Sequence, residues 1–534
     1  MARRRRSKSK ALAMASAQAM APQQGAGMAA YTAGDPHERT MRTWYTSAGS
    51  ADADLIPELS TIVPRSRDLS RNNGIASAGL QTMKDNIVGN ILKLSSKPHY
   101  KLLGMTAEQA EEMGNSIEAE FETFFHTTEC DAARTNNLLG LTLQALAGAM
   151  MNGETLAVPV WQPRPGHRWN TRIQLIEADR LATPPGRELD GRIRGGVEVD
   201  QFGAPLAYHI QRTHPGDRLG LIGMFDPAAY ARVPAFTPHG LRRVIHLYDS
   251  ERTGQSRGRP IVTSVMKQFR LAGKYADAHL ETAVAQSLIA AFLESDLSPE
   301  ASTELFGATP STAWKDQLSG YHAQLQGAAV IPLPAGAKLS AFNPSQPNPA
   351  FEAFMQHTLR NIAAGLNIPY ELLLKDFSKT NYSSARAALL EAWRYFKGRR
   401  RWLTDHWLRP IYELWMEEAA WAGRLPGIGH ADYHANRYAY ARCRWTFAGR
   451  GWVDPVKEAN AAKIRMEIGI STLEDECAEQ GLDWEEVIAQ RARERQRMRE
   501  LGLPLHDEAL PQDTASNDAS DDEPEANQAG GQPQ

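Results

Sequence analysis

NYSSARAALLEAWRYFKGRRRWLTDHWLRPIYELWMEEAAW, residues 381–421, is the stretch around which the rest of this chain must be arranged. Large apolar side chains recur in it at spacings of three and four, which predicts one continuous helical stripe. The stripe consists of Leu389, Trp393, Phe396, Leu403, Trp407, Ile411 and Leu414. A helix of this length is roughly 60 Å long at 1.5 Å rise per residue. We therefore expect a long helix whose aromatic face needs partners.

Three local features modify this helix. Ser383 and Ser384 are predicted to cap its start, because a hydroxyl accepts an otherwise orphaned backbone N–H. Pro410 cannot donate to the previous turn and its ring crowds that turn, so a kink is expected near 406–409. Arg400 falls on the apolar stripe and interrupts it.

The composition of the chain limits the classes of protein to which it can belong. The chain has 534 residues, a formal net charge of −3 and 42% hydrophobic residues, so it is not built to bind nucleic acid over its whole surface. Cys130, Cys443 and Cys477 form neither a disulfide framework nor a CxxC zinc pattern. The longest apolar runs are too short to cross a bilayer, and no apolar signal core follows the basic residues 1–10. A soluble cytoplasmic protein is the expectation.

The chain before the long helix predicts an α+β, mostly helical protein. Residues 1–50 are read as a flexible basic arm. Helical periodicity predicts helices at 75–88, 107–125, 136–151, 261–294 and 350–366. Strands are expected at 91–94, 100–103, 156–161, 172–176, 196–199, 207–211 and 244–247, with Gly and Pro turns between them. Between the last two helices, 295–348 is predicted as a small α/β insert with a helix at 313–326 and strands at 328–333 and 338–342.

Beyond 421, residues 430–447 look strand-like because they are aromatic. Helices are predicted at 455–467, 472–480 and 483–499, with Thr472 and Asp475 resembling a capping box. The acidic tail from residue 507 is read as disordered.

Sequence patterns for catalysis are weak. The GQSRG segment at 254–258 would place Ser256 as a nucleophile, but its strand ends early and no helix follows at once, so a loop serine is expected. His430 and His434 have the i, i+4 spacing of a metal pair, yet the Glu of HExxH is missing and the flanks look like a loop entering a strand. Packing or surface roles are expected for both. The consecutive Glu417 and Glu418 suit solvation. No catalytic residue, metal or cofactor is predicted.

Basic residues near the long helix leave two interpretations open. Lys375, Lys379 and the Arg399–Arg401 run could donate charge-assisted hydrogen bonds to phosphates. The same residues could equally form a solvated helix face.

Four segments together resemble the portal proteins of tailed bacteriophages, specifically the lambda type. They are RNNGIASAGLQTMKDNIVG (71–89), VIHLYDSERTGQSRGRPIVTSVM (244–266), AAGLNIPYELLLKDFSKTNYSSARAALLEAWRYFKGRRRWL (363–403) and EIGISTLEDECAEQGLDWEEVIAQRARE (467–494). They occur in the family's order, and the third is the most specific. The second contains GQSRG, so the resemblance accounts for that motif without a hydrolase.

The resemblance implies a portal fold with named parts. These are an α+β wing (51–262), a first stem helix (263–294), an inserted α/β clip (295–348), a second stem helix (349–369), a tunnel loop (370–382), a long kinked helix with the wing return (383–447) and a helical crown (448–506). The arm at 1–50 and the disordered tail at 507–534 lie outside the resemblance.

The resemblance also implies a function and partners. It implies a ring, usually a dodecamer, at one capsid vertex of the virion, assembled in the host cytoplasm. Double-stranded DNA would pass through the ring without sequence specificity during packaging and ejection. The terminase large subunit, the major capsid and scaffold proteins and head-completion connector proteins would be partners, and no membrane is involved.

Within this reading the residues expected to face DNA come from the tunnel loop: Lys375, Ser378, Lys379, Thr380, Asn381 and Tyr382. A further basic contact is possible at Lys397, Arg399, Arg400 and Arg401. The alternative functions are a non-portal DNA-binding or scaffolding module and, less favoured, a hydrolase that uses Ser256 or a metal on His430 and His434.

Overall fold

The computed structural model describes residues 33, 35, 38–46, 48–217, 225–288, 291–293, 330–332, 349–451 and 454–503. The chain divides into two compact units, 1–54 and 55–534. In the first unit the carboxylate of Glu38 accepts backbone hydrogen bonds from Thr40 and Met41 and holds a short turn. Most of the predicted arm, the helix at 313–326, the strand at 338–342 and the acidic tail lie outside the described residues.

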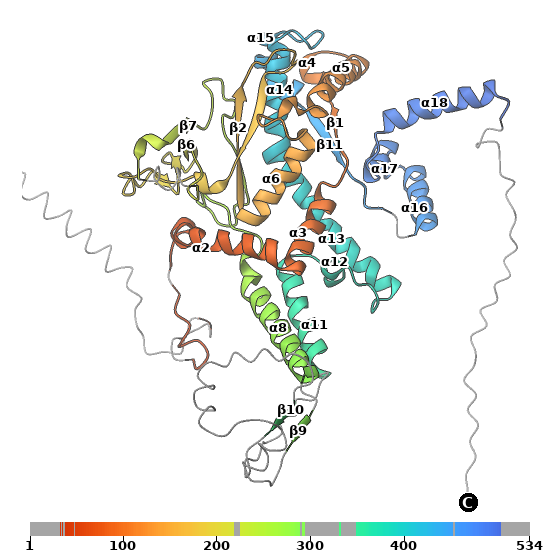
Figure 1. Ribbon diagram of the computed structural model, residues 1–534. Coiled ribbons are helices and arrows are strands. Elements are labelled where there is room, and N and C mark those ends of the chain that lie inside the picture. Colours follow the sequence, from red (N-terminus) through yellow and green to blue (C-terminus); the bar gives the residue numbers. More distant parts are fainter. Residues whose placement is uncertain are drawn as a thin grey trace, which may run out of the picture. The chain divides into compact units, whose positions relative to one another are not determined.

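Helices dominate the start of the second unit (Figure 1). Several of them begin at a polar cap. Asn73 caps α3, Thr106 and Gln109 form a capping box on α5, and Asn137 caps α6. Gly153 ends α6 at φ +88°, a conformation that glycine adopts without steric cost. The helices are α2 (Ala51–Asn72), α3 (Gly74–Ile87), α4 (Tyr100–Leu103), α5 (Ala107–Phe125) and α6 (Leu138–Asn152).

Two antiparallel sheets follow. One has the order β3-β2-β8 and consists of β2 (Glu154–Trp161), β3 (Thr171–Ile176) and β8 (Ile245–Tyr248). The other is a meander of β4 (Ile193–Arg194), β5 (Val197–Val199), β6 (Pro205–Gln211) and β7 (Tyr230–Pro234). The strands predicted in this region are present, and β4 and β7 were not predicted. The α+β, mostly helical class is confirmed.

The long helix forms as predicted, with one modification. It consists of α13 (Tyr382–Leu403), a π-helical turn (Thr404–Leu408) and α14 (Arg409–Trp421), which we call the spine. The irregularity lies where the kink was expected, because Pro410 has no N–H to donate to the previous turn. The predicted serine caps are wrong: Asn381 caps the helix by accepting from the Ser384 N–H at 2.8 Å.

The core is built on the spine. Trp407, Tyr412 and Trp415 are completely buried, and Phe121 of α5 lies edge-on to Tyr412 and Trp415. The Trp407 indole N–H donates to Thr142 of α6 at 3.1 Å, so its polar edge is satisfied inside the core.

Glu418 belongs to this core as well. Its carboxylate is buried and accepts the backbone N–H groups of Asn170 and Thr171, each at 2.8 Å. The expectation that Glu418 is solvated is wrong, because the start of β3 supplies donors that the sequence pattern did not reveal.

The return of the chain after the spine differs from its prediction. Residues 430–447 are not one strand but the helix α15 (His430–Tyr440) followed by β11 (Cys443–Phe447). Strand β11 pairs antiparallel with β1 (Leu92–Ser96), which joins two distant parts of the sequence. The aromatic content suggested a strand, but Tyr433 and Tyr440 are buried residues of the helix α15.

A pair of helices flanks the segment predicted as an insert. They are α8 (Met266–Leu288) and α11 (Pro349–Gly365), which lie side by side through Tyr275, Phe351 and Phe354 (Figure 1). The predicted helix at 261–294 is too long at both ends. It starts after a 3₁₀ turn (Thr263–Val265), and β9 (Ala291–Leu293) follows it in parallel pairing with β10 (Val330–Pro332).

Two shorter predictions are also corrected. Tyr100–Leu103 is the helix α4 rather than a strand, and the first part of the predicted loop at 370–382 is the helix α12 (Tyr370–Leu374). The last helices match closely: α16 (Pro455–Glu467), α17 (Leu473–Glu479) and α18 (Trp484–Glu500). Thr472 caps α17 as predicted.

None of the described helices is long and apolar enough to span a bilayer. The three cysteines are free thiols.

The GQSRG segment holds the two sheets together. Arg257 donates to the Glu154 carboxylate of β2 at 2.7 Å and to the backbone carbonyls of Leu181 and Gly195. His246 of β8 lies 2.9 Å from the same carboxylate. Burial alone raises the pKa of Glu154, but the Arg257 charge and the His246 hydrogen bond outweigh it and lower the pKa to about 2.

This network makes a prediction about stability and pH. A carboxyl with a depressed pKa stabilises the fold above its unfolded value of 4.5, and this contribution is lost as pH falls toward 2. Glu154→Gln leaves Arg257 buried without its counter-charge, and we expect a loss of about 3–5 kcal/mol at pH 7. Urea denaturation between pH 7 and 2.5 should show a flatter pH dependence for the variant. Glu251→Gln, at an exposed pair with Arg259, is the control. Equal pH slopes in wild type and Glu154→Gln would contradict the assignment.

Candidate nucleic-acid interface

The predicted DNA-facing residues lie in and just after a short exposed loop between α12 and α13. Lys375 ends α12 in the left-handed conformation, φ +57°, and turns the chain away from the helix. The Asp376 carboxylate then accepts the Ser378 N–H at 3.0 Å, and Thr380 donates its hydroxyl to the Phe377 carbonyl at 2.9 Å. Asn381 closes the loop by capping the spine. The sequence therefore builds a compact turn with its own hydrogen bonds.

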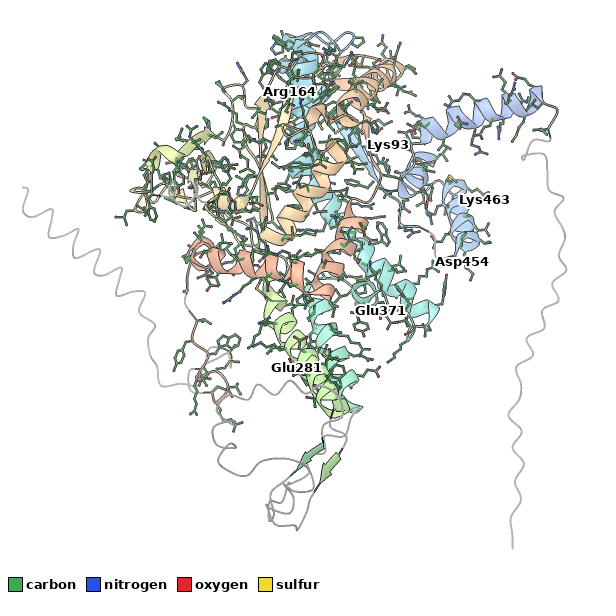
Figure 2. The ribbon with its side chains drawn as sticks, in the orientation of Figure 1. Lys93, Arg164, Glu281, Glu371, Asp454 and Lys463 are labelled. Carbon is green, nitrogen blue, oxygen red and sulfur yellow. The ribbon has the colours of Figure 1, made fainter. Side chains whose placement is uncertain are left out.

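The side chains of this loop are available to a ligand. Lys375, Ser378 and Lys379 are exposed, and Tyr382 is 48% exposed at the start of the spine. Lys379 forms an ion pair with Glu352 of α11, and this pair lowers the pKa of Glu352. Both partners are highly exposed, so the pair is weak and open to exchange. Figure 2 labels Glu371 on α12, just before the loop.

Three of the four predicted basic residues of the spine share one cleft, and three of the four form ion pairs within the subunit. Lys397 forms an ion pair with Glu479 of α17, Arg399 with Asp249 and Arg401 with Asp405. Three of the four, Lys397, Arg400 and Arg401, line a cleft of about 1150 Å³, which α17 and β11 also line. The cleft is also lined by five further arginines and four carboxylates, so basic groups outnumber acidic ones by eight to four. They are Arg409, Arg442, Arg444, Arg450, Arg465, Asp405, Asp475, Glu476 and Glu479.

Arg400 is held in place by hydrogen bonds and ring contacts within the protein. Its guanidinium donates to the backbone carbonyls of Asn86, Ile87 and Ala448 at 2.8–2.9 Å, and it lies over the rings of Trp393 and Phe447. Burial lowers its pKa to about 10. Arg400, which interrupts the apolar stripe, therefore links the spine to α3 and to the end of β11.

The other candidate residues are placed as follows. Ser256 lies in a loop well before α8 begins at Met266, so no nucleophile elbow is formed. His430 and His434 lie on α15, not in a loop, and both contact Glu417 of α14. Sequence reasoning missed Glu417 as their partner, because 13 and 17 positions separate it from the two histidines and only the turn between α14 and α15 brings them together.

Comparison with known proteins agrees with this architecture. The family described as phage portal protein, lambda family, matches residues 37–400. Portal protein B of Escherichia phage lambda is 30% identical over 479 residues, covering 87% of this chain and 88% of its own length. The portal protein of Escherichia phage N15 is 29% identical with 87% and 89% coverage, and the probable portal protein of Halomonas phage phiHAP-1 is 25% identical with 86% and 85% coverage.

Among solved structures, a chain from the virion of a native gene transfer agent particle is similar at a TM-score of 0.38 and 13% identity, covering 80% of this chain and 93% of its own. This similarity is too distant to place individual loops. The sequence matches, over most of the chain, define its class: this chain belongs to the lambda family of phage portal proteins.

The environment of Arg400 gives a testable consequence. Arg400→Met keeps the aliphatic stem but leaves three carbonyls without their donor, and we expect a loss of about 2–4 kcal/mol. Chemical denaturation measures it, with the exposed Arg401→Met as the matched control. If the two variants unfold at the same denaturant concentration, Arg400 does not fasten the spine.

Proposed function

We propose that this chain assembles into a ring at one capsid vertex of a phage virion and that the ring is the channel through which double-stranded DNA is packaged and ejected. The observation that carries the proposal is the match to lambda-family portal proteins along 87% of the chain. The terminase motor and the head-completion connector proteins dock on the ring, and the capsid and scaffold proteins surround it. Assembly takes place in the host cytoplasm.

Unburied apolar surface supports ring formation. In the described part of the chain neither α16 nor α18 has a buried residue, although both carry large apolar side chains. Exposed examples there and on α8 are Leu271, Leu280, Val284, Val456, Ile464 and Ile488. A head-to-tail ring buries such surfaces against the neighbouring subunit, and twelve subunits are the number we propose.

The parts of the ring follow the order of the chain. We assign 51–262 with the spine and β11 to the wing, α8 and α11 to the stem, 295–348 to the clip and α16–α18 to the crown. The support is the adjacency of α8 and α11 on either side of the segment assigned to the clip.

The loop at 375–382 is proposed to face the DNA. Each lysine held on a phosphate strengthens binding and steepens its salt dependence, so a strongly basic channel would grip DNA rather than let it slide. The loop contains two lysines and one acidic residue, Asp376. One of the lysines, Lys379, forms an ion pair with Glu352. Its hydroxyl and amide groups add weak contacts that do not depend on base sequence. Contacts of this kind suit a sliding polymer.

Ring formation can be tested directly. Purified full-length protein at micromolar concentration should form rings with a central channel, of twelve subunits or a neighbouring number, in averaged negative-stain images. Monodisperse particles of one subunit without a hole would contradict the proposal, and light scattering coupled to gel filtration supplies the mass independently.

The loop at 375–382 gives a further prediction. Lys375→Ala combined with Lys379→Ala removes two phosphate contacts per subunit, so particles should retain several-fold less DNA while rings still form. Lys101→Ala, at an exposed position on α4, is the control. DNA content of purified particles is the measurement, repeated at two salt concentrations. Normal packaging and retention by the double variant would argue against the loop as a DNA contact.

A further inference from the structure

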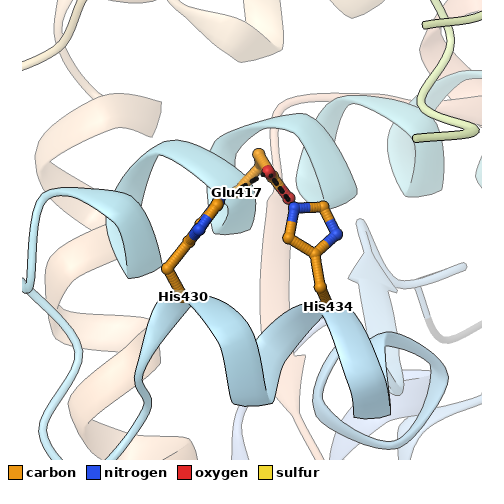
Figure 3. Close-up of side chains that lie close together, drawn as sticks. All are labelled: Glu417, His430 and His434. Atoms are coloured by element: carbon orange, nitrogen blue, oxygen red, sulfur yellow. Dashed lines mark hydrogen bonds and ion pairs between the residues drawn. The ribbon is translucent and has the colours of Figure 1, made fainter. Parts of the chain in front are cut away.

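Three side chains from two helices converge at one point near the turn between α14 and α15. Glu417 comes from the last turns of α14, and His430 and His434 come from the first two turns of α15 (Figure 3). The Oε1 atom of Glu417 lies 3.0 Å from the Nε2 atom of His430 and 2.6 Å from that of His434. Their potential ligand atoms all lie within 4.8 Å of one another.

We propose that Glu417, His430 and His434 form a binding site for a divalent transition-metal ion, Zn²⁺ in the first place. Two imidazole nitrogens and one carboxylate oxygen are a ligand set typical of open zinc sites, in which solvent takes the remaining position. Imidazole also selects this group of metals over Mg²⁺ and Ca²⁺, which favour oxygen ligands. The proposal stands independently of the function proposed above.

The geometry requires little rearrangement. Residues four apart on a helix project from the same face, and α15 is helical through both histidines. Around a tetrahedral Zn²⁺ with bonds of about 2.0–2.2 Å, neighbouring ligand atoms are about 3.3 Å apart. The two nitrogens therefore need to move from the Glu417 oxygen by less than about 1 Å, a shift that side-chain rotation supplies.

The carboxylate has bonding capacity left. Glu417 Oε1 forms a hydrogen bond with His430 and an ion pair with His434, whereas Glu417 Oε2 is buried and has no hydrogen-bond partner among the described residues. A buried acceptor without a donor is costly, and an ion on the same carboxylate would relieve that cost. Metal binding replaces the Nε2 protons, and each ring then carries its proton on Nδ1. Both rings are partly exposed, so water can reach them.

The surroundings limit how tightly the site binds. Arg242 and Arg243 line the same solvent-open pocket as Glu417 and His430, and their charges oppose a cation. The ring centroid of His239 lies 5.6 Å from that of His434, and His239 is outside the group whose ligand atoms lie within 4.8 Å of one another. We therefore expect micromolar rather than picomolar affinity.

A second cluster provides a comparison. Glu177, Asp179 and His214 also lie close together, but Arg67 already forms an ion pair with Asp179. A metal there would have to displace a guanidinium. This cluster is therefore the natural control.

Occupation of the proposed site would have a structural effect. The ion would join the end of α14 to the start of α15 and close the connection at residues 422–429. Since α15 leads directly into β11, which pairs with β1, the metal would hold residues 430–447 in place against the core.

Isothermal titration of metal-free full-length protein with ZnCl₂ tests the proposal. Wild type and the control His214→Ala should each bind about one Zn²⁺ per subunit at the site. Glu417→Gln and His434→Ala should lower that affinity at least about 100-fold, the upper end of what loss of even a supporting group costs. Far-UV circular dichroism and the midpoint of thermal unfolding in chelator establish that the variants are folded.

Cobalt absorption gives a second, direct readout. Co²⁺ added to wild type should produce visible absorption that Zn²⁺ displaces and that folded Glu417→Gln lacks. The proposal is overturned if wild type takes up no Zn²⁺ at 100-fold excess over the protein, or if the Glu417 and His434 variants bind as tightly as wild type. Loss of binding in His214→Ala alone would move the site to the second cluster and overturn it equally.

Discussion

Burial of the aromatic face of the spine is the interaction on which the rest of this fold depends. Trp407, Tyr412 and Trp415 are completely buried, and each such ring removes about 150–250 Å² from water. The elements that cover them come from five separate parts of the chain: α5, α6, β3, β1 and β11. A single helix thus brings together segments that are hundreds of residues apart.

The spine also decides how charge is distributed. The four basic residues predicted as a DNA contact all have partners within the subunit: Lys397 with Glu479, Arg399 with Asp249, Arg400 with backbone carbonyls and Arg401 with Asp405. The loop before the spine keeps its polar groups exposed. For a protein whose proposed ligand must slide, a loop with few charges avoids a strong electrostatic trap.

Short motifs took their meaning from tertiary contacts. GQSRG resembles a nucleophile pattern, yet its arginine is the cation that compensates the buried Glu154 and links two sheets. The His430 and His434 pair resembled a loop feature, yet a helix aligns the two rings and the preceding helix supplies Glu417. In both cases the deciding partner is an acidic residue on another element: Glu154 is 103 positions from Arg257, and Glu417 is 13 positions from His430.

What the sequence by itself determined is periodicity and local chemistry. The spacing of apolar residues predicted the spine, α5 and α11 within a few residues, because a helix must present one apolar face to a core. The polar cap at Thr472 marked the start of α17 for a similarly local reason. The motif order at 363–403 and elsewhere was enough to indicate the family, which the match over residues 37–400 confirms.

What only the tertiary structure decided is which distant groups meet. Periodicity could not show that Tyr433 and Tyr440 pack on a helix rather than a strand, since aromatic residues suit both. It could not show that Glu418 is buried, because its donors lie in β3, nor that Glu417 faces two histidines. A pattern along the chain records which side chains need partners, and the free energy of packing in three dimensions selects those partners.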